Sequence, residues 1–130
     1  MAKHNERLVE LLSPATSLRG TAVGGFEPRH RGQTRDLLQV SRHDELKHLI
    51  ELLSFDEDSL GEHVSLMTPG DIQLNFLAGH KPLASIVLIL PQFLRWDALP
   101  HDARLLDPPA LEAWLAAHGW QSPGSTGRAQ

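Results

Sequence analysis

Three stretches of the chain place apolar residues at helical spacing. The clearest is residues 42–54, in which Leu46, Leu49, Ile50 and Leu53 fall at positions i, i+3, i+4 and i+7. This pattern predicts an amphipathic helix whose apolar stripe faces the core of the protein. Acidic residues in its first turn favour the helix further, because they lie near the positive end of the helix dipole.

Weaker patterns predict a helix near each end of the chain. Residues 5–12 carry apolar side chains at helical spacing, with Asn5 as the expected N-cap. Towards the other end, Asp107 is expected to cap a helix that carries proline in its first turn and stops at Gly119. We expect Trp120 to fold back as the hydrophobic contact of that helix end.

Alternating and continuous apolar runs predict a sheet in the middle of the chain. Over residues 71–76, apolar and polar residues alternate, which is typical of a strand with one buried face. The turn-forming residues 78–81 then lead to residues 83–90, an almost continuous apolar run that needs cover on both faces. Further short strands are expected near residues 21–23, 35–40, 64–67 and 93–97.

Together these elements predict a single α+β domain over residues 1–120 and a disordered tail over residues 121–130. We expect an antiparallel sheet of about four to six strands, packed on about three helices in two layers. The second face of the run 83–90 then has to meet the N-terminal helix, a folded-over loop or another copy of the chain. Val87 and Leu88, in the middle of that run, are therefore candidate contact residues.

Composition and charge narrow the possible functions. The chain of 130 residues is 41% hydrophobic, as in an ordinary globular domain, and its lack of cysteine excludes disulfides and thiolate chemistry. A net charge of −4 argues against nucleic-acid binding. No apolar run is long enough to cross a membrane, and no signal-peptide pattern is present. We therefore expect a cytoplasmic protein with neither a nucleic-acid nor a membrane partner.

No catalytic or cofactor motif stands out in the sequence. No serine lies in a G-x-S-x-G motif. The run GTAVGG matches neither the dinucleotide-binding motif G-x-G-x-x-G nor the P-loop. Residues 56–67 begin like a calcium loop, but Leu60 and Met67 occupy positions that need oxygen ligands. His43 and His48 are five residues apart and do not share a helix face. We therefore assign no catalytic residue, metal or cofactor.

Two groups of polar and aromatic residues are candidates for binding a partner. Arg29, Arg31 and Arg35 lie in a stretch with glycine and proline, where guanidinium groups could grip a carboxylate or phosphate of the partner. The alternative is that these arginines pair with the acidic connector after the second helix and only solubilise a loop. Arg95 and Trp96 form the second group, since the indole of Trp96 is a candidate wall of a surface groove.

The end of the chain resembles that of small bacterial proteins. It combines a hairpin, the triplet Arg95-Trp96-Asp97 and a helix capped by Asp107, and this resemblance implies no particular function.

The patterns as a whole favour a non-enzymatic domain that binds another protein or a peptide, as accessory and immunity proteins do. A homodimer formed through the sheet is one version of this hypothesis. The alternative is a small metal-binding protein or hydrolase-type enzyme that uses histidines and carboxylates. Its candidate residues are His30, His63, His80 and His101.

Overall fold

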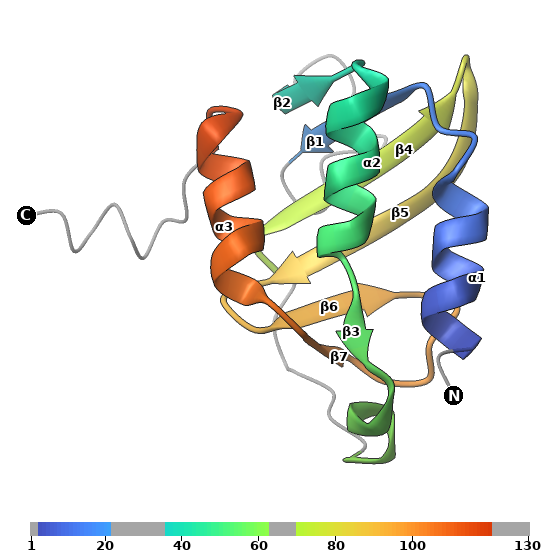
Figure 1. Cartoon of the computed structure of the whole chain (residues 1–130), viewed down its shortest axis with the longest axis vertical. Coiled ribbons are helices and arrows are strands. Elements are labelled where there is room, and N and C mark those ends of the chain that lie inside the picture. The colour runs from blue at the N-terminus through green and yellow to red at the C-terminus, as the bar shows by residue number, and fades with distance from the viewer. Residues whose placement is uncertain (1–2, 22–35, 63–69, 121–130) are drawn as a thin grey trace, which may run out of the picture.

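The computed structural model describes residues 3–21, 36–62 and 70–120. Within these ranges the chain has the α+β fold that the sequence predicts (Figure 1). The helices are α1 (Lys3–Leu12), α2 (His43–Leu52) and α3 (Pro108–Ala117), with a short 3-10 helix η2 (Glu57–Glu62). No helix among the described residues is long and apolar enough to cross a membrane. The strands are β1 (Ser17–Thr21), β2 (Asp36–Val40), β3 (Phe55–Asp56), β4 (Ile72–Ala78), β5 (Lys81–Ile89), β6 (Phe93–Trp96) and β7 (Ala103–Leu105).

The described strands form one antiparallel sheet in the order β2-β1-β4-β5-β6-β7-β3. Its seven strands exceed the number expected from the sequence, because β3 and β7 have only two and three residues and cannot show an alternating pattern. β1 also begins earlier than the expected run at 21–23. The strand expected at 64–67 and the tail at 121–130 lie outside the described residues.

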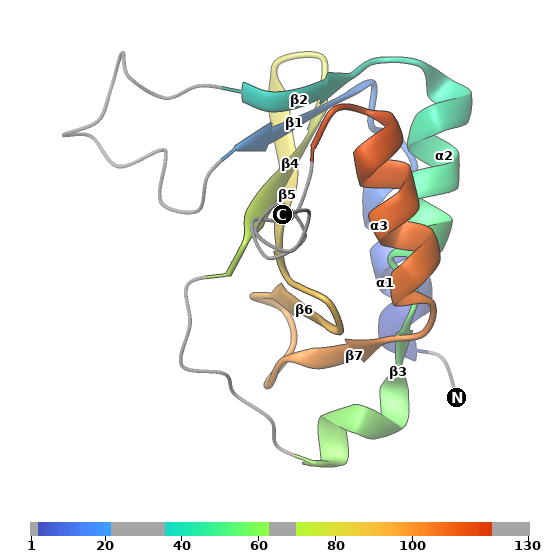
Figure 2. The same ribbon diagram turned by 90° about the vertical axis from the view of Figure 1, so that its left-hand side faces the viewer.

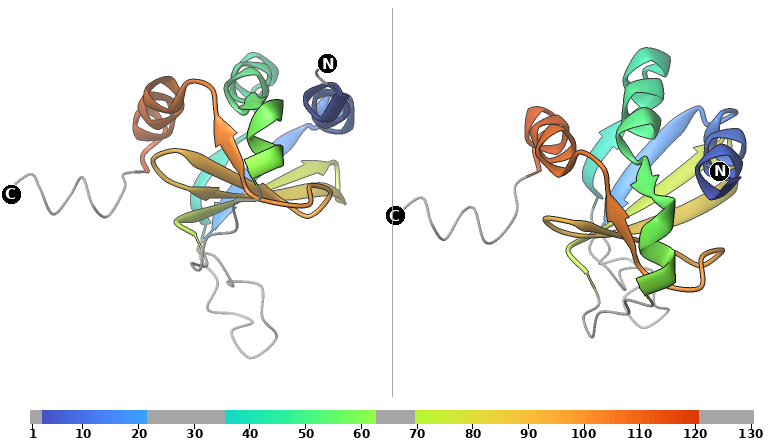
Figure 3. Two further views of the ribbon diagram at one scale, coloured as in Figure 1. Left: turned by 90° about the horizontal axis from the view of Figure 1, so that it is seen from below. Right: turned by 60° about the horizontal axis from the view of Figure 1, so that its bottom comes forward.

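All three α-helices lie on the same side of the sheet, with α2 between α1 and α3 (Figures 2 and 3). The apolar residues of the central hairpin point to that side. Ile72 is paired with Leu88 and Leu74 with Ile86 across β4 and β5, and all four side chains are fully buried. The alternation predicted for β4 is therefore confirmed, and its apolar face forms the centre of the core.

The opposite side of β5 is less apolar and better covered than the sequence pattern suggests. Ser85 is exposed, Val87 is half-buried and Ile89 is buried. Gly70 has a positive φ of 103° and lies so close to Val87 that a Cβ at Gly70 would overlap the Val87 side chain. The backbone that leads into β4 thus covers part of this face, whereas α1 lies with the other helices and does not cover it (Figure 2).

A polar cluster occupies the neighbouring part of the same face. The side-chain amide of Asn75 on β4 donates to the backbone oxygen of Arg19 at 3.0 Å and to Thr21 Oγ1 at 3.2 Å, both on β1. Its Oδ1 accepts from Ser85 Oγ on β5 at 2.8 Å. Asn75 therefore joins three strands, and its burial is compensated by hydrogen bonds.

The ends of α3 are formed by the local signals that predict them. Asp107 Oδ1 accepts a hydrogen bond from the Ala110 N–H at 3.3 Å, as an N-cap does. Gly119 has a φ of 95°, and the N–H of Trp120 donates to the Leu115 oxygen at 3.0 Å. Trp120 is buried, so the predicted hydrophobic contact of this helix end is confirmed.

Asn5 is not the N-cap that the sequence suggests. The helix α1 begins at Lys3, and the Asn5 side chain binds the backbone of β3 instead. This prediction is wrong because a tertiary contact competes with the local cap for the same amide.

Candidate functional site

A solvent-open groove of about 280 Å³ lies between α1 and α2. Ala15, Leu46 and Ile50 form its apolar floor and are each less than 10% exposed. Val9 lies on the α1 side of the groove and is 44% exposed. Leu106 is the other large hydrophobic residue exposed in the described part of the chain, and it lies beyond β7. Val9 is thus an apolar side chain available to a partner beside an apolar floor.

The α2 side of the groove has a charged rim. His43, Lys47 and Glu51 line the groove at intervals of four residues, so they form one row along the helix. Within the described ranges, neither the Lys47 amine nor the Glu51 carboxylate makes an ion pair or a side-chain hydrogen bond. Both charges therefore remain available to a binding partner.

The groove is not evident from the hydrophobic pattern, although the chain carries one signal for it. Leu8 and Leu12 are four residues apart and fully buried, so they define the buried stripe of α1. Val9 lies next to Leu8 in sequence and hence about 100° away around the helix, off that stripe. An apolar residue beside a complete stripe indicates a second contact, but the sequence does not show that α2 lies there.

Arg95 and Trp96 line a second surface depression, together with the loop that joins β6 and β7. Arg95 donates from Nε to Asp102 Oδ1 at 2.9 Å and from Nη2 to Oδ2 at 3.0 Å. The hydrogen bond to Asp102 is the main cause that raises the pKa of Arg95 above its ordinary value, and burial opposes it. Asp102 is buried, and Trp96 is only 6% exposed. This bidentate pair mainly fixes the loop, and little of the indole reaches the surface.

The other residues selected from the sequence are scattered. Val87 lies opposite Arg95 in the β5–β6 register, half-buried on the face away from the helices. Leu88 is 0% exposed and faces the helices, so it offers no surface to a partner. Three further candidates, Arg29, Arg31 and Arg35, lie outside the described residues.

The histidines do not converge on one site where the structure describes them. His80 is exposed in the β4–β5 turn, whereas His101 is half-buried beside the Arg95 depression. In residues 3–21, 36–62 and 70–120, no three histidine, aspartate or glutamate side chains come together as a metal site would require. His30 and His63 lie outside these ranges.

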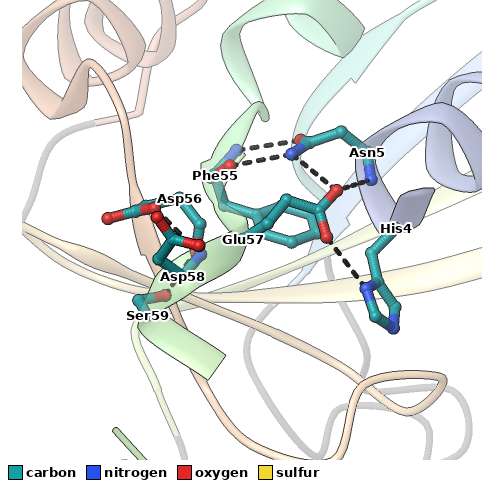
Figure 4. A network of polar contacts seen from close by, with 7 residues as sticks. All are labelled: His4, Asn5, Phe55, Asp56, Glu57, Asp58 and Ser59. Atoms are coloured by element: carbon teal, nitrogen blue, oxygen red, sulfur yellow. Dashed lines mark hydrogen bonds and ion pairs between the residues drawn. The ribbon is translucent and has the colours of Figure 1, made fainter. Parts of the chain in front are cut away.

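A polar network ties the start of α1 to β3 and η2 (Figure 4). The Asn5 side chain donates to the Phe55 oxygen at 2.8 Å and accepts from the Phe55 N–H at 3.0 Å. Because β3 is an edge strand, this amide occupies backbone groups that would otherwise be open to another strand. The same network includes Glu57, which accepts from the Asn5 N–H at 2.7 Å and lies 2.9 Å from His4 Nδ1.

The network determines how Glu57 titrates. Burial raises the pKa of Glu57, but the hydrogen bonds from Asn5 and His4 and the charge of His4 outweigh it. The pKa of Glu57 is therefore lowered from its ordinary value of 4.5. The ionised carboxylate thus helps to hold α1 in place, and so keeps one wall of the groove in position.

No family model, curated protein or solved structure matches this chain.

Proposed function

We propose that this protein is a non-enzymatic domain that works by binding another protein chain through the groove between α1 and α2. The observation that carries the proposal is the exposure of Val9, at 44%, beside the apolar floor formed by Ala15, Leu46 and Ile50. An apolar centre with a polar rim is typical of protein interfaces. A groove of about 280 Å³ is large enough to accept one or two apolar side chains of the partner.

The depression at Arg95 and Trp96 supports binding less strongly. Its guanidinium is already paired with Asp102, and the Trp96 side chain is largely covered. A partner would have to break a bidentate ion pair to use that guanidinium directly, at a cost in free energy. The groove needs no such rearrangement, because Val9, Lys47 and Glu51 are already exposed.

Site-specific photo-crosslinking tests the proposal. A photoreactive amino acid replaces Val9 in one variant and Leu106, the matched exposed residue outside the groove, in a control variant. Irradiation in cells of the source organism should yield a defined protein adduct from position 9 and none from position 106. The crosslinked partner, once identified and purified, should bind wild-type protein at least about tenfold more tightly than it binds Val9→Asp.

The opposite results would contradict the proposal. They are the same adducts from both positions, no adduct from position 9, or equal affinity of the wild type and Val9→Asp. Leu106→Asp serves as the control in the affinity measurement, and circular dichroism establishes that each variant is folded.

A further inference from the structure

The charged rim of the groove is self-complementary. Lys47 and Glu51 carry opposite charges one helical turn apart, and neither is paired within the described part of the molecule. An antiparallel copy of the same row presents Glu51 where the first copy presents Lys47, and Lys47 where the first presents Glu51. A single surface therefore supplies both halves of two ion pairs.

We infer that the protein chain bound in the α1–α2 groove is a second copy of this protein. This inference rests on the proposed function and names the partner. It differs from the homodimer expected from the sequence, because the contact lies on the helices and not on the sheet. Leu88, on the sheet, is fully buried within a single chain, whereas Val9 on α1 is exposed.

Two-fold symmetry explains how one groove serves both copies. In an isologous dimer, the same surface of both copies forms the contact. If one residue of the first copy contacts another residue of the second copy, the same two residues also meet with the copies exchanged. Consider a two-fold axis that runs across α1 and α2 and passes between Lys47 and Glu51. It places α2 of one copy antiparallel to α2 of the other. Lys47 of each copy then lies opposite Glu51 of the other. Val9 and the apolar floor of each groove are then covered by the other copy.

Different groups determine the affinity of the dimer and the register of its two helices. Burial of Val9 and of the apolar floor drives association, since it removes apolar surface from water. Surface ion pairs add little affinity, but a like-charge contact at the same position is unfavourable and excludes other registers. The dimer is therefore expected to be weak, with a Kd of about 10–100 µM, and to depend on the order of the two charges.

The first experiment measures the mass of the purified full chain by sedimentation velocity or light scattering between about 1 and 500 µM. The wild type should pass from the mass of one chain to that of two. Val9→Asp should weaken dimerisation at least about tenfold, and the matched control Leu106→Asp should leave the Kd within about twofold. A wild type that stays a monomer over the whole range overturns the inference, as does equal weakening by both variants.

The second experiment tests the pairing of the charges. Lys47→Glu and Glu51→Lys each place like charges opposite one another, so each variant alone should dimerise at least about fivefold more weakly than the wild type. An equimolar mixture of the two variants should recover dimers, because one copy now carries only acidic groups and the other only basic groups at these positions. The double variant Lys47→Glu/Glu51→Lys should also dimerise within about threefold of the wild type. Failure of both rescues overturns the proposed register.

These results distinguish the inference from the proposed function. A monomeric protein that crosslinks from position 9 to a different protein refutes the second copy but supports the binding function. A monomer without any adduct from position 9 refutes both.

Discussion

The two flanks of α2 are built in different ways. On the flank towards α3, which we call the closed flank, Trp114 and Leu115 are buried, and the His118 ring stacks on Trp114 at 3.8 Å between centroids. His118 Nε2 also lies 3.1 Å from the Glu45 carboxylate on α2. Towards α1 the contact is open, with a groove of about 280 Å³ and the exposed Val9.

The difference follows from how each outer helix is held. The helix α3 buries Trp114 and contacts α2 through His118, whose Nε2 lies 3.1 Å from the Glu45 carboxylate. The helix α1 buries Leu8 and Leu12, while its first turn is tied to β3 and η2 by the network of Asn5 and Glu57. Because α1 is anchored away from α2, its flank towards α2 need not be filled. The closed flank therefore contributes buried surface, whereas the open flank leaves Val9 exposed.

The largest expected effect is on the closed flank. Leu115→Ala should lower the free energy of unfolding by about 2–5 kcal/mol, because it removes a fully buried side chain and leaves a cavity. Urea denaturation followed by tryptophan fluorescence measures the change. A loss below about 1 kcal/mol would show that the α3 contact is not closed.

The second-largest loss of stability is expected when the contacts that anchor α1 are removed. Asn5→Ala removes the amide that pairs with both backbone groups of Phe55, so we expect a loss of about 1–3 kcal/mol in the free energy of unfolding. Glu10→Ala, an exposed change on the same helix, is the control and should stay within about 0.5 kcal/mol of the wild type. Equal effects of the two substitutions would mean that Asn5 does not anchor the helix.

The same anchor should make stability depend on pH. The pKa of Glu57 is lowered below 4.5 in the folded protein, so the ionised carboxylate stabilises the fold above pH 4.5. That contribution declines as the pH falls through the folded-state pKa. The difference in unfolding free energy between the wild type and Glu57→Gln should therefore be largest near neutral pH and shrink in acid. A difference that grows in acid would contradict this linkage.

A smaller effect on stability is expected from the contact between His118 and Glu45 on the closed flank. His118→Gln removes a partly exposed contact with Glu45, and we expect a loss of no more than about 1 kcal/mol. Because His118 stacks on Trp114, the substitution should also change the tryptophan emission. Unchanged emission in the folded variant would argue against the stacked arrangement.

The smallest effect on stability belongs to the open flank. Val9→Ala should change the free energy of unfolding by less than about 0.5 kcal/mol, because the side chain is already 44% exposed. Thermal or urea denaturation at low protein concentration measures it without a contribution from association. A loss as large as that of Leu115→Ala would mean that Val9 belongs to the core and that the groove is not open.

Much of the fold could be predicted from local patterns. The helix at residues 42–54, the strands of the central hairpin and both ends of α3 correspond to observed elements within a few residues. Each depends on spacing or on a capping side chain that acts within one or two turns of chain. β3 and β7 could not be found in this way, because short strands exist only where a distant partner pairs with them.

The candidate site was less predictable. Arg95 and Trp96 do line a depression, but only the structure shows that Asp102 occupies the guanidinium and that the indole is mostly covered. In the sequence, Val9 lies off the apolar stripe formed by Leu8 and Leu12, but this spacing does not show which element lies beside it. Its exposure depends on which neighbour α1 packs against, and no periodicity carries that information.

Periodicity and capping chemistry specify helices, strands and their buried faces, because these features arise from backbone geometry repeated over a few residues. The order of the strands, the use of Asn5 to cover the edge of β3 and the unequal flanks of α2 arise only when residues some fifty positions apart come into contact. Those contacts compete for the same side chains as local capping does. Which contact a side chain such as Asn5 makes therefore depends on the packing of the whole molecule.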